Sequence, residues 1–305
     1  MTAVTGVPLL PPRELIVQGV RQQAQQRMAQ RRGQRGTDAP PPAMLVRRGL
    51  QRLGLHPDDD EPLRGDVTGR RALVVATNHG QLDLGKPTGV FASELTVPYY
   101  AFLDAGMIVD VASPRGGVIP VDPQSLKPAI RTAADDRLLG DDDLRGKLTE
   151  SLAIGDLDMD DYAIVYLAGG WGAAFDLGTS EAVGRQVTAA NAAGAVLGGV
   201  CHGPLGLLKA TDTDGRPLVA GRRVTAVTDK QVHELGIEST PQHPETELRR
   251  AGARFESQHA FRDPFANHWV VDGNLVTGQN QNAAPMVARL MMEEAARSAP
   301  DPAAG

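Results

Sequence analysis

The chain has 305 residues, 41% of them apolar, and its 31 basic and 37 acidic side chains give a formal net charge of −6. This acidic balance excludes a general nucleic-acid-binding surface, which would be basic. The sequence has no apolar run of about 18 residues, and no basic segment followed by an apolar one at its start, so we expect neither a transmembrane helix nor a secretory signal. We therefore expect a cytoplasmic protein that binds neither membranes nor nucleic acids.

The first part of the chain differs in composition from the rest. A stretch rich in Gln and Arg at 19–35 is followed by three consecutive prolines at 40–42 and by an acidic patch at 58–61. Prolines in such a segment form a semi-rigid linker, and the few apolar residues cannot build a core of their own. We therefore predict three parts, with the bounds 1–69 for a partly helical or disordered extension, 70–298 for an α/β domain and 299–305 for a tail.

Short apolar runs alternate with helical patterns after residue 70. The apolar runs predict strands at 72–77, 107–112, 163–167, 195–200, 223–227 and 269–271. Apolar residues at helical spacing predict helices at 88–105, 179–191, 245–251 and 283–297, with Pro98 expected to kink or break the first of them. This alternation indicates βαβ units and a parallel sheet. The runs that end at Thr77, Gly169 and Cys201 should therefore converge on one site at the carboxyl ends of the strands.

The segment Gly199-Val-Cys-His-Gly203 has the pattern of a nucleophile elbow, in which a buried strand turns sharply and presents a reactive side chain at the apex. Glycines two positions to either side remove side chains that would clash. Backbone N–H groups after the apex can stabilise a thiolate and a developing oxyanion, so we expect Cys201 to be a nucleophile with a pKa below that of free cysteine. Cys201 is also the only cysteine of the chain, which excludes an intramolecular disulfide. The alternative is a buried structural cysteine at the end of a core strand.

Five segments together resemble a known family. They are Thr88-Gly-Val-Phe-Ala-Ser-Glu94, Ala168-Gly-Gly-Trp-Gly-Ala-Ala-Phe-Asp-Leu177, Gly199-Val-Cys-His-Gly-Pro204, Gly215-Arg-Pro-Leu-Val-Ala-Gly221 and Val271-Asp-Gly-Asn-Leu-Val-Thr-Gly-Gln-Asn280. Their order resembles the ThiJ/PfpI family of the class I glutamine-amidotransferase-like superfamily, in the branch of heat-shock chaperones and glyoxalase III proteins. The resemblance covers roughly residues 71–293. It implies a flavodoxin-like α/β sandwich with a mostly parallel central sheet and helices on both faces.

The resemblance also implies roles for individual residues. Cys201 matches the family's nucleophile, and His202 matches its adjacent histidine. Glu94 matches the glutamate that hydrogen-bonds the thiol and moves protons. Gly169 and Gly170 match the glycine turn that, together with the N–H of His202, supplies an oxyanion hole. The chemistry of the residues agrees, because a proton-moving carboxyl group needs the raised pKa that an enclosed site provides.

The sequence departs from the family pattern at two places in the site. The family often carries a histidine after the two glycines, where this chain has Trp171, and a large indole is expected to narrow the pocket. Many members also orient the adjacent histidine with a downstream acid. That position falls near Val232 here, and either Asp229 or Glu234 could serve as the third member of the triad.

By resemblance, the protein is a cofactor-independent homodimeric enzyme that acts on small reactive carbonyls. It would convert methylglyoxal and water to lactate, as glyoxalase III does, or have the related deglycase activity. Three alternatives remain: a stress holdase chaperone, a redox sensor that uses oxidation of Cys201, and an amidohydrolase of the glutamine amidotransferase type. The last would use His243 and Glu245, but His243 follows Cys201 at about half the expected separation and fits a loop before the helix at 245–251.

Metal binding is a further possibility that the sequence does not favour. His79, His259 and His268 are predicted in loops and could act as ligands. Their spacing matches no known metal motif, so we expect no metal site.

Overall fold

The computed structural model describes residues 61–82, 85–237 and 239–298. Most of the extension predicted at 1–69 and the tail predicted at 299–305 therefore lie outside the described residues. In the described part of the chain, no helix has the length and apolar character needed to cross a membrane.

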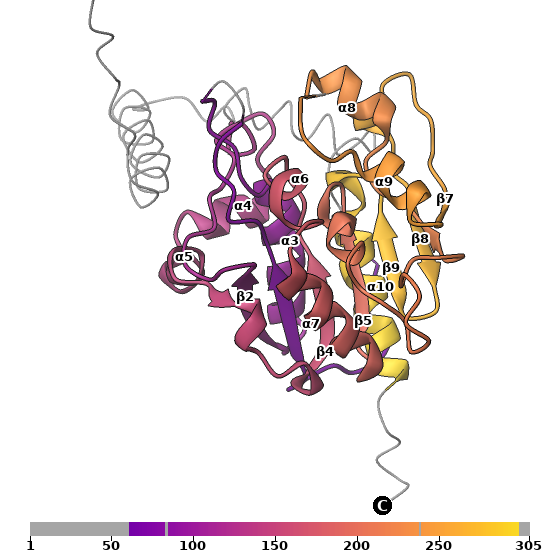
Figure 1. Cartoon of the computed structure of the whole chain (residues 1–305). Helices are drawn as coiled ribbons and strands as arrows, with labels where there is room; N and C mark the ends of the chain where they lie inside the picture. The colour runs from indigo at the N-terminus through magenta and orange to yellow at the C-terminus, as the bar shows by residue number, and fades with distance from the viewer. Residues whose placement is uncertain (1–60, 83–84, 238, 299–305) are drawn as a thin grey trace, which may run out of the picture. The chain divides into compact units, whose positions relative to one another are not determined.

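A seven-stranded sheet forms the centre of the fold, in the order β3-β2-β1-β4-β5-β9-β8 (Figure 1). All neighbouring strands are parallel except β8, which runs antiparallel to β9 at one edge. The strands are β1 (Arg71–Val75), β2 (Ile108–Ser113), β3 (Leu152–Ala153), β4 (Tyr162–Leu167), β5 (Val196–Val200), β8 (Trp269–Asp272) and β9 (Leu275–Gly278). The predicted mostly parallel sheet is confirmed.

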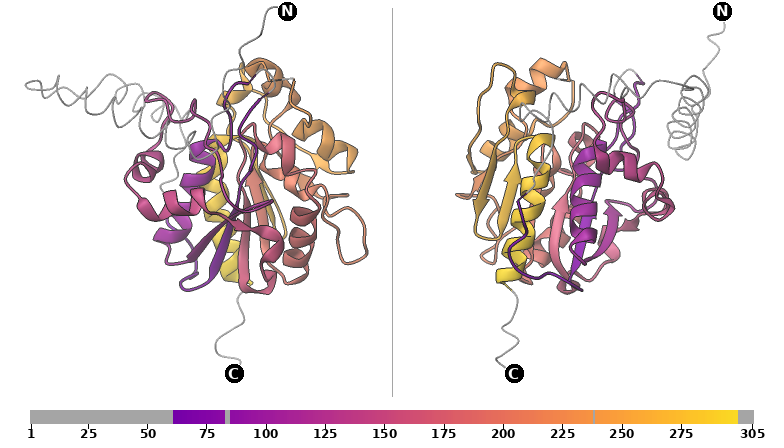
Figure 2. Two further views of the ribbon diagram at one scale, coloured as in Figure 1. Left: turned by 60° about the vertical axis from the view of Figure 1, so that its left-hand side comes forward. Right: turned by 180° about the vertical axis from the view of Figure 1, so that it is seen from behind.

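Helices cover both faces of this sheet. Successive residues of a strand point to opposite faces, and those of β1 belong to two different apolar clusters. One cluster includes α3 (Ala92–Asp104) and α10 (Ala284–Arg297), which lie side by side in Figure 2, and the other includes α7 (Glu181–Ala192). The shorter helices are α4 (Ala133–Leu138), α5 (Asp142–Thr149), α6 (Ala173–Asp176), α8 (Asp229–Leu235) and α9 (Pro244–Arg250). The fold is thus the predicted α/β sandwich.

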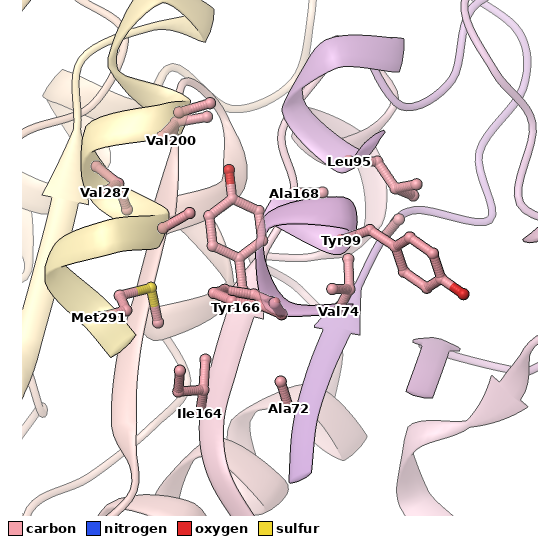
Figure 3. Packing of buried hydrophobic residues seen from close by; sticks show 14 of the residues in the cluster. Ala72, Val74, Leu95, Tyr99, Ile164, Tyr166, Ala168, Val200, Val287 and Met291 are labelled. Atoms are coloured by element: carbon pink, nitrogen blue, oxygen red, sulfur yellow. The ribbon is translucent and has the colours of Figure 1, made fainter. Parts of the chain in front are cut away.

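Large side chains fill the layer between the sheet and the helices α3 and α10. Tyr166 of β4 is fully buried there, and its ring lies edge-on to that of Phe102, with 6.2 Å between the centroids. Figure 3 shows Tyr166 beside Val287 and Met291 of α10. Burial of each side chain of this size contributes roughly 1.5–3 kcal/mol, so this layer holds β4 and α3 firmly beneath the turn that follows β4.

The structure corrects two of the predicted elements and adds a strand to the central sheet. The helix predicted at 88–105 begins only at Ala92 and runs through Pro98 without a break, because nine of its thirteen residues are buried and this packing outweighs one lost hydrogen bond. The strand predicted at 223–227 is only β6 (Arg223–Val224), which pairs with β7 (Arg254–Phe255) in a separate two-stranded sheet. Strand β9, which pairs with β5, had no sequence prediction.

The start of the α/β domain offers a first testable prediction. Val67 is 1% exposed and belongs to the core, so the packing begins before residue 70. A chain that begins at Arg70 should lose about 1.5–3 kcal/mol relative to one that begins at Glu61, which lowers the melting temperature by several degrees. Thermal unfolding of both truncations beside the full chain measures this difference. Equal melting temperatures would show that Val67 does not stabilise the domain.

Candidate active site

Cys201 lies at the apex of a strained turn directly after β5. Its φ of 59° makes it the only non-glycine residue with a left-handed backbone among those described. A β-carbon at Gly199 or at Gly203 would overlap the carbonyl oxygen of Leu167 in the neighbouring strand. The backbone can therefore turn at Cys201 only because glycine occupies both flanking positions, as the elbow pattern predicts.

The segment after the cysteine is shorter than the α-helix that usually follows a nucleophile elbow. Residues Gly203–Leu207 form a single 3₁₀ helix of five residues. The backbone N–H groups of His202 and Gly170 nevertheless act on the sulfur and favour its thiolate form. One of these N–H groups comes from the elbow and the other from the glycine turn after β4.

Glu94 in the first turn of α3 reaches the same point. Its side chain is 1% exposed, and the thiol of Cys201 and the N–H groups of Gly169 and Gly170 act on its carboxyl group. Its Oε2 has no hydrogen-bond partner that meets the usual geometry among the described residues. Burial raises the pKa of this carboxyl group to about 8, against the opposing effect of these hydrogen bonds. Glu94 therefore keeps its proton through most of the neutral range and can exchange it with the sulfur.

The expectation of a lowered pKa for Cys201 is wrong. The side chain is 6% exposed, and burial raises the pKa of the thiol well above its usual value, as does the neighbouring carboxylate of Glu94. The N–H groups of Gly170 and His202 oppose this rise without cancelling it. Because one negative charge repels a second, Cys201 and Glu94 together carry at most one negative charge near neutral pH and share the remaining proton.

His202 is fully buried beside the thiol. Its Nδ1 lies 3.4 Å from Sγ of Cys201, and its Nε2 has no hydrogen-bond partner among the described residues. Burial, and secondarily repulsion from His243, lower the pKa of the imidazole to about 3. The ring is therefore neutral at physiological pH.

Both carboxylates considered as the third triad member have other hydrogen-bond partners. Asp229 accepts a hydrogen bond of 2.6 Å from the hydroxyl of Thr246, and Glu234 accepts one of 2.9 Å from the backbone N–H of Asp263. In the part of the chain that the structure describes, neither reaches Nε2 of His202. The geometry thus gives no support for a Cys-His-Asp or Cys-His-Glu relay through these residues.

The two residues of the amidotransferase alternative lie at the N-terminus of helix α9. His243 precedes α9, and the carboxylate of Glu245 accepts hydrogen bonds from the N–H of Asp229 and from Arg249. These are the contacts of a helix N-terminus, as expected for a loop histidine before a helix.

The loop residues Thr77, His79, His259 and His268 do not line the cavity at Cys201. Thr77 donates its hydroxyl to Asp176 over 2.7 Å and does not line the cavity at the cysteine, so only the ends of β4 and β5 meet there as predicted. The imidazole of His79 stacks on Phe175, with 3.9 Å between the centroids. Nδ1 of His259 lies 3.8 Å from a carboxylate oxygen of Asp263.

A cavity of about 310 Å³ opens onto Cys201 and Glu94. Its remaining lining comes from α3, α8, two short 3₁₀ turns and several loops, namely Phe91, Ser93, Ala129, Ile130, Gly170, Trp171, Gln231, Leu235, Pro264, Phe265, Gln281 and Asn282. Trp171 lines the cavity, as the sequence led us to expect. The tertiary structure thus provides a substrate-sized space above the nucleophile.

Two residues at the site were missed in the sequence. Gln231 lines the cavity, is 2% exposed, and its side-chain oxygen has no hydrogen-bond partner among the described residues. Gln231 lies next to Val232, the position near which the acidic residue of the family was expected. Its place in the sequence could therefore have indicated a site residue, although its residue type did not. The buried hydroxyl of Tyr166 also has no partner among those residues and interacts electrostatically with Glu94 and Cys201. The apolar pattern of strand β4 does not indicate that the hydroxyl of Tyr166 lies at the site.

The raised pKa of Glu94 predicts how stability depends on pH. Between pH 4.5 and 8 the folded state binds more protons than the unfolded state, so this carboxyl group makes stability fall as the pH rises. His202 acts in the opposite sense, but only between pH 3 and 6.5. From pH 6.5 to 8 we therefore expect the wild type to lose about 2 kcal/mol relative to Glu94→Gln. Urea unfolding of both proteins across this window measures the difference, and parallel curves would contradict it.

The fold and the site together are those of an α/β enzyme with a buried cysteine on an elbow and a protonatable carboxyl group beside it. Residues 87–294 match the DJ-1/PfpI family, and the chain belongs to this family. It is 30% identical to the glutathione-independent glyoxalase hsp3101 of Schizosaccharomyces pombe, over 72% of this chain and 93% of the relative. It is also 30% identical to the glutathione-independent glyoxalase HSP31 of Saccharomyces cerevisiae, over 70% and 93% of the two chains.

Solved structures show the same likeness. The crystal structure of glyoxalase III from Candida albicans superposes with a TM-score of 0.68 at 26% identity, covering 74% of this chain and 97% of the other. The likeness therefore spans nearly the whole of that glyoxalase and, in this chain, the described α/β domain.

Proposed function

We propose that this protein is a glutathione-independent glyoxalase that converts a 2-oxoaldehyde and water into a 2-hydroxy acid, as in methylglyoxal to lactate. The observation that carries this proposal is the buried pair of Cys201 and Glu94 at the base of a cavity. A nucleophile bound directly to a group that can move a proton near neutral pH is what this isomerisation requires. The glyoxalase names of the relatives support the same reaction class.

The proposed reaction begins with the thiolate of Cys201, formed while Glu94 holds the shared proton. The sulfur adds to the aldehyde carbon, the C=O bond becomes C–O⁻, and the oxygen takes up a proton to give a hemithioacetal. The N–H groups of Gly170 and His202 are the donors for this developing oxyanion. Glu94, left as a carboxylate, is then ready to act as a base.

The second half transfers a proton between the two carbons. Glu94 removes the hydrogen of the former aldehyde carbon, which gives an enediolate, and returns this proton to the neighbouring carbon. The hydroxyl proton of the first carbon passes to the oxygen of the second, so that the product is a 2-hydroxy thioester. Water cleaves the thioester and releases the hydroxy acid and the thiol. One carbon is oxidised and the other is reduced, so the electrons balance within the substrate and no external oxidant or reductant is consumed. Neutral His202, with Nδ1 3.4 Å from the sulfur, can accept a hydrogen bond from the thiol as it is released.

Incubation of the purified protein with methylglyoxal, without glutathione, tests the proposal. We expect lactate to form in proportion to the methylglyoxal consumed. Glutamine serves as the control substrate for an amidotransferase-type reaction and should yield no ammonia. Consumption of methylglyoxal without lactate would leave only adduct formation and would refute a glyoxalase. Sedimentation of the same sample tests the homodimer that the family resemblance implies.

A further inference from the structure

The cavity above Cys201 has two chemically different ends. Its buried end carries polar groups, since Glu94, Cys201 and Gln231 are 1%, 6% and 2% exposed. Its solvent end is apolar: Ile130, Leu235 and Phe265 line it and are 43%, 40% and 46% exposed. The half-buried rings of Phe91 and Trp171 also belong to the lining.

This apolar end is unusual for the molecule. Three of the nine strongly exposed large apolar side chains in the described part of the chain line this one cavity. Such side chains are unfavourable in water and gain free energy when an apolar group covers them. The acetyl group of methylglyoxal is too small to do so, because a cavity of about 310 Å³ reaches the range that holds drug-sized ligands, about 300–1,000 Å³.

The polar end indicates how such a substrate would be oriented. The side-chain oxygen of Gln231 is a buried acceptor without a partner among the described residues. Leaving a buried acceptor unpaired is costly, and a hydroxyl of the hemithioacetal or enediol would satisfy it. That contact would hold the reacting carbons at Cys201 and direct the substituent of the ketone carbon toward Ile130, Leu235 and Phe265.

We propose that this site selects 2-oxoaldehydes whose ketone carbon carries a branched or cyclic apolar group, such as isobutyl or cyclohexyl, over methylglyoxal. This inference rests on the proposed glyoxalase function. The apolar end of the cavity supplies the selectivity, because each added methylene that it buries favours the larger substrate. Gln231 acts as a positioning residue.

The test compares kcat/KM for methylglyoxal, isobutylglyoxal and cyclohexylglyoxal. An alkyl series changes the size of the substituent while the electronic character of the carbonyl groups stays similar. We expect kcat/KM to rise at least tenfold from the methyl to the isobutyl compound. One additional methylene group buried in an apolar pocket changes kcat/KM by about tenfold or more. In Leu235→Ser and Ile130→Ser, the ratio of the cyclohexyl to the methyl value should fall about five- to tenfold.

Ile108→Ser is the matched control, because Ile108 is 51% exposed at the start of β2 and does not line the cavity. It should leave both the activity and the ratio unchanged, and melting curves establish that each variant is folded. A kcat/KM that falls or stays level along the series would overturn the inference while methylglyoxal turnover upholds the glyoxalase. A rising series whose ratio does not change in Leu235→Ser and Ile130→Ser would refute the assignment to the apolar end. Absence of hydroxy acid from all three substrates would instead refute the proposed function itself.

Discussion

Cys201→Ala should abolish glyoxalase activity, with a fall in kcat of about four orders of magnitude or more. The variant keeps the elbow, because alanine has no larger side chain than cysteine, but it has no atom that can bond to the aldehyde carbon. Without the hemithioacetal there is no intermediate from which Glu94 can remove a proton. Measurement of lactate from methylglyoxal, with circular dichroism to establish folding, provides the test.

The same variant separates the enzyme from its alternatives. A holdase acts through apolar surface, so its suppression of aggregation would be preserved in Cys201→Ala. A redox sensor would lose its response to peroxide but would show no lactate formation in the wild type either. Residual lactate formation above a few per cent would show that the nucleophile is not Cys201.

Glu94→Gln should lower the turnover of methylglyoxal by roughly two to four orders of magnitude. Glutamine keeps the shape and can still hydrogen-bond the sulfur and the N–H groups of Gly169 and Gly170, but it cannot accept and return a proton. Alkylation of Cys201 should persist, because the thiol remains in place. The control is Glu181→Gln, since Glu181 lies in the first turn of α7 as Glu94 does in that of α3, with its side chain 70% exposed.

The pH dependence of kcat/KM provides a second readout for Glu94→Gln. The Cys201–Glu94 pair loses its first proton near pH 8, so the reactive monoanion grows about tenfold per pH unit below that value. In the wild type we expect log kcat/KM to rise with pH and to level off near 8. The remaining activity of Glu94→Gln should lack that inflection. Turnover close to the wild-type value in this variant would assign the proton transfer to another group, with His202 as the next candidate.

Local sequence patterns determined much of this protein. The alternation of apolar runs and helical patterns was sufficient for the α/β class, because burial on both faces of a parallel sheet requires continuous apolar strands. The glycines around Cys201 were sufficient for the elbow, because the only residue that fits beside the carbonyl of Leu167 is one without a β-carbon. Both patterns are short in sequence, and both can be recognised without knowledge of the tertiary contacts.

The tertiary structure alone decided the chemistry of the site. The meeting of Glu94 and Cys201, more than one hundred residues apart, depends on how α3 packs against α10 and against Tyr166 of β4. The pKa of Cys201 was misjudged because its sign depends on burial and on a neighbouring carboxylate, neither of which is a property of the elbow sequence. The unpaired oxygen of Gln231 and the apolar end of the cavity were likewise unforeseen. Solvation and charge at a point are set by all the atoms that surround it, and these come from distant parts of the chain.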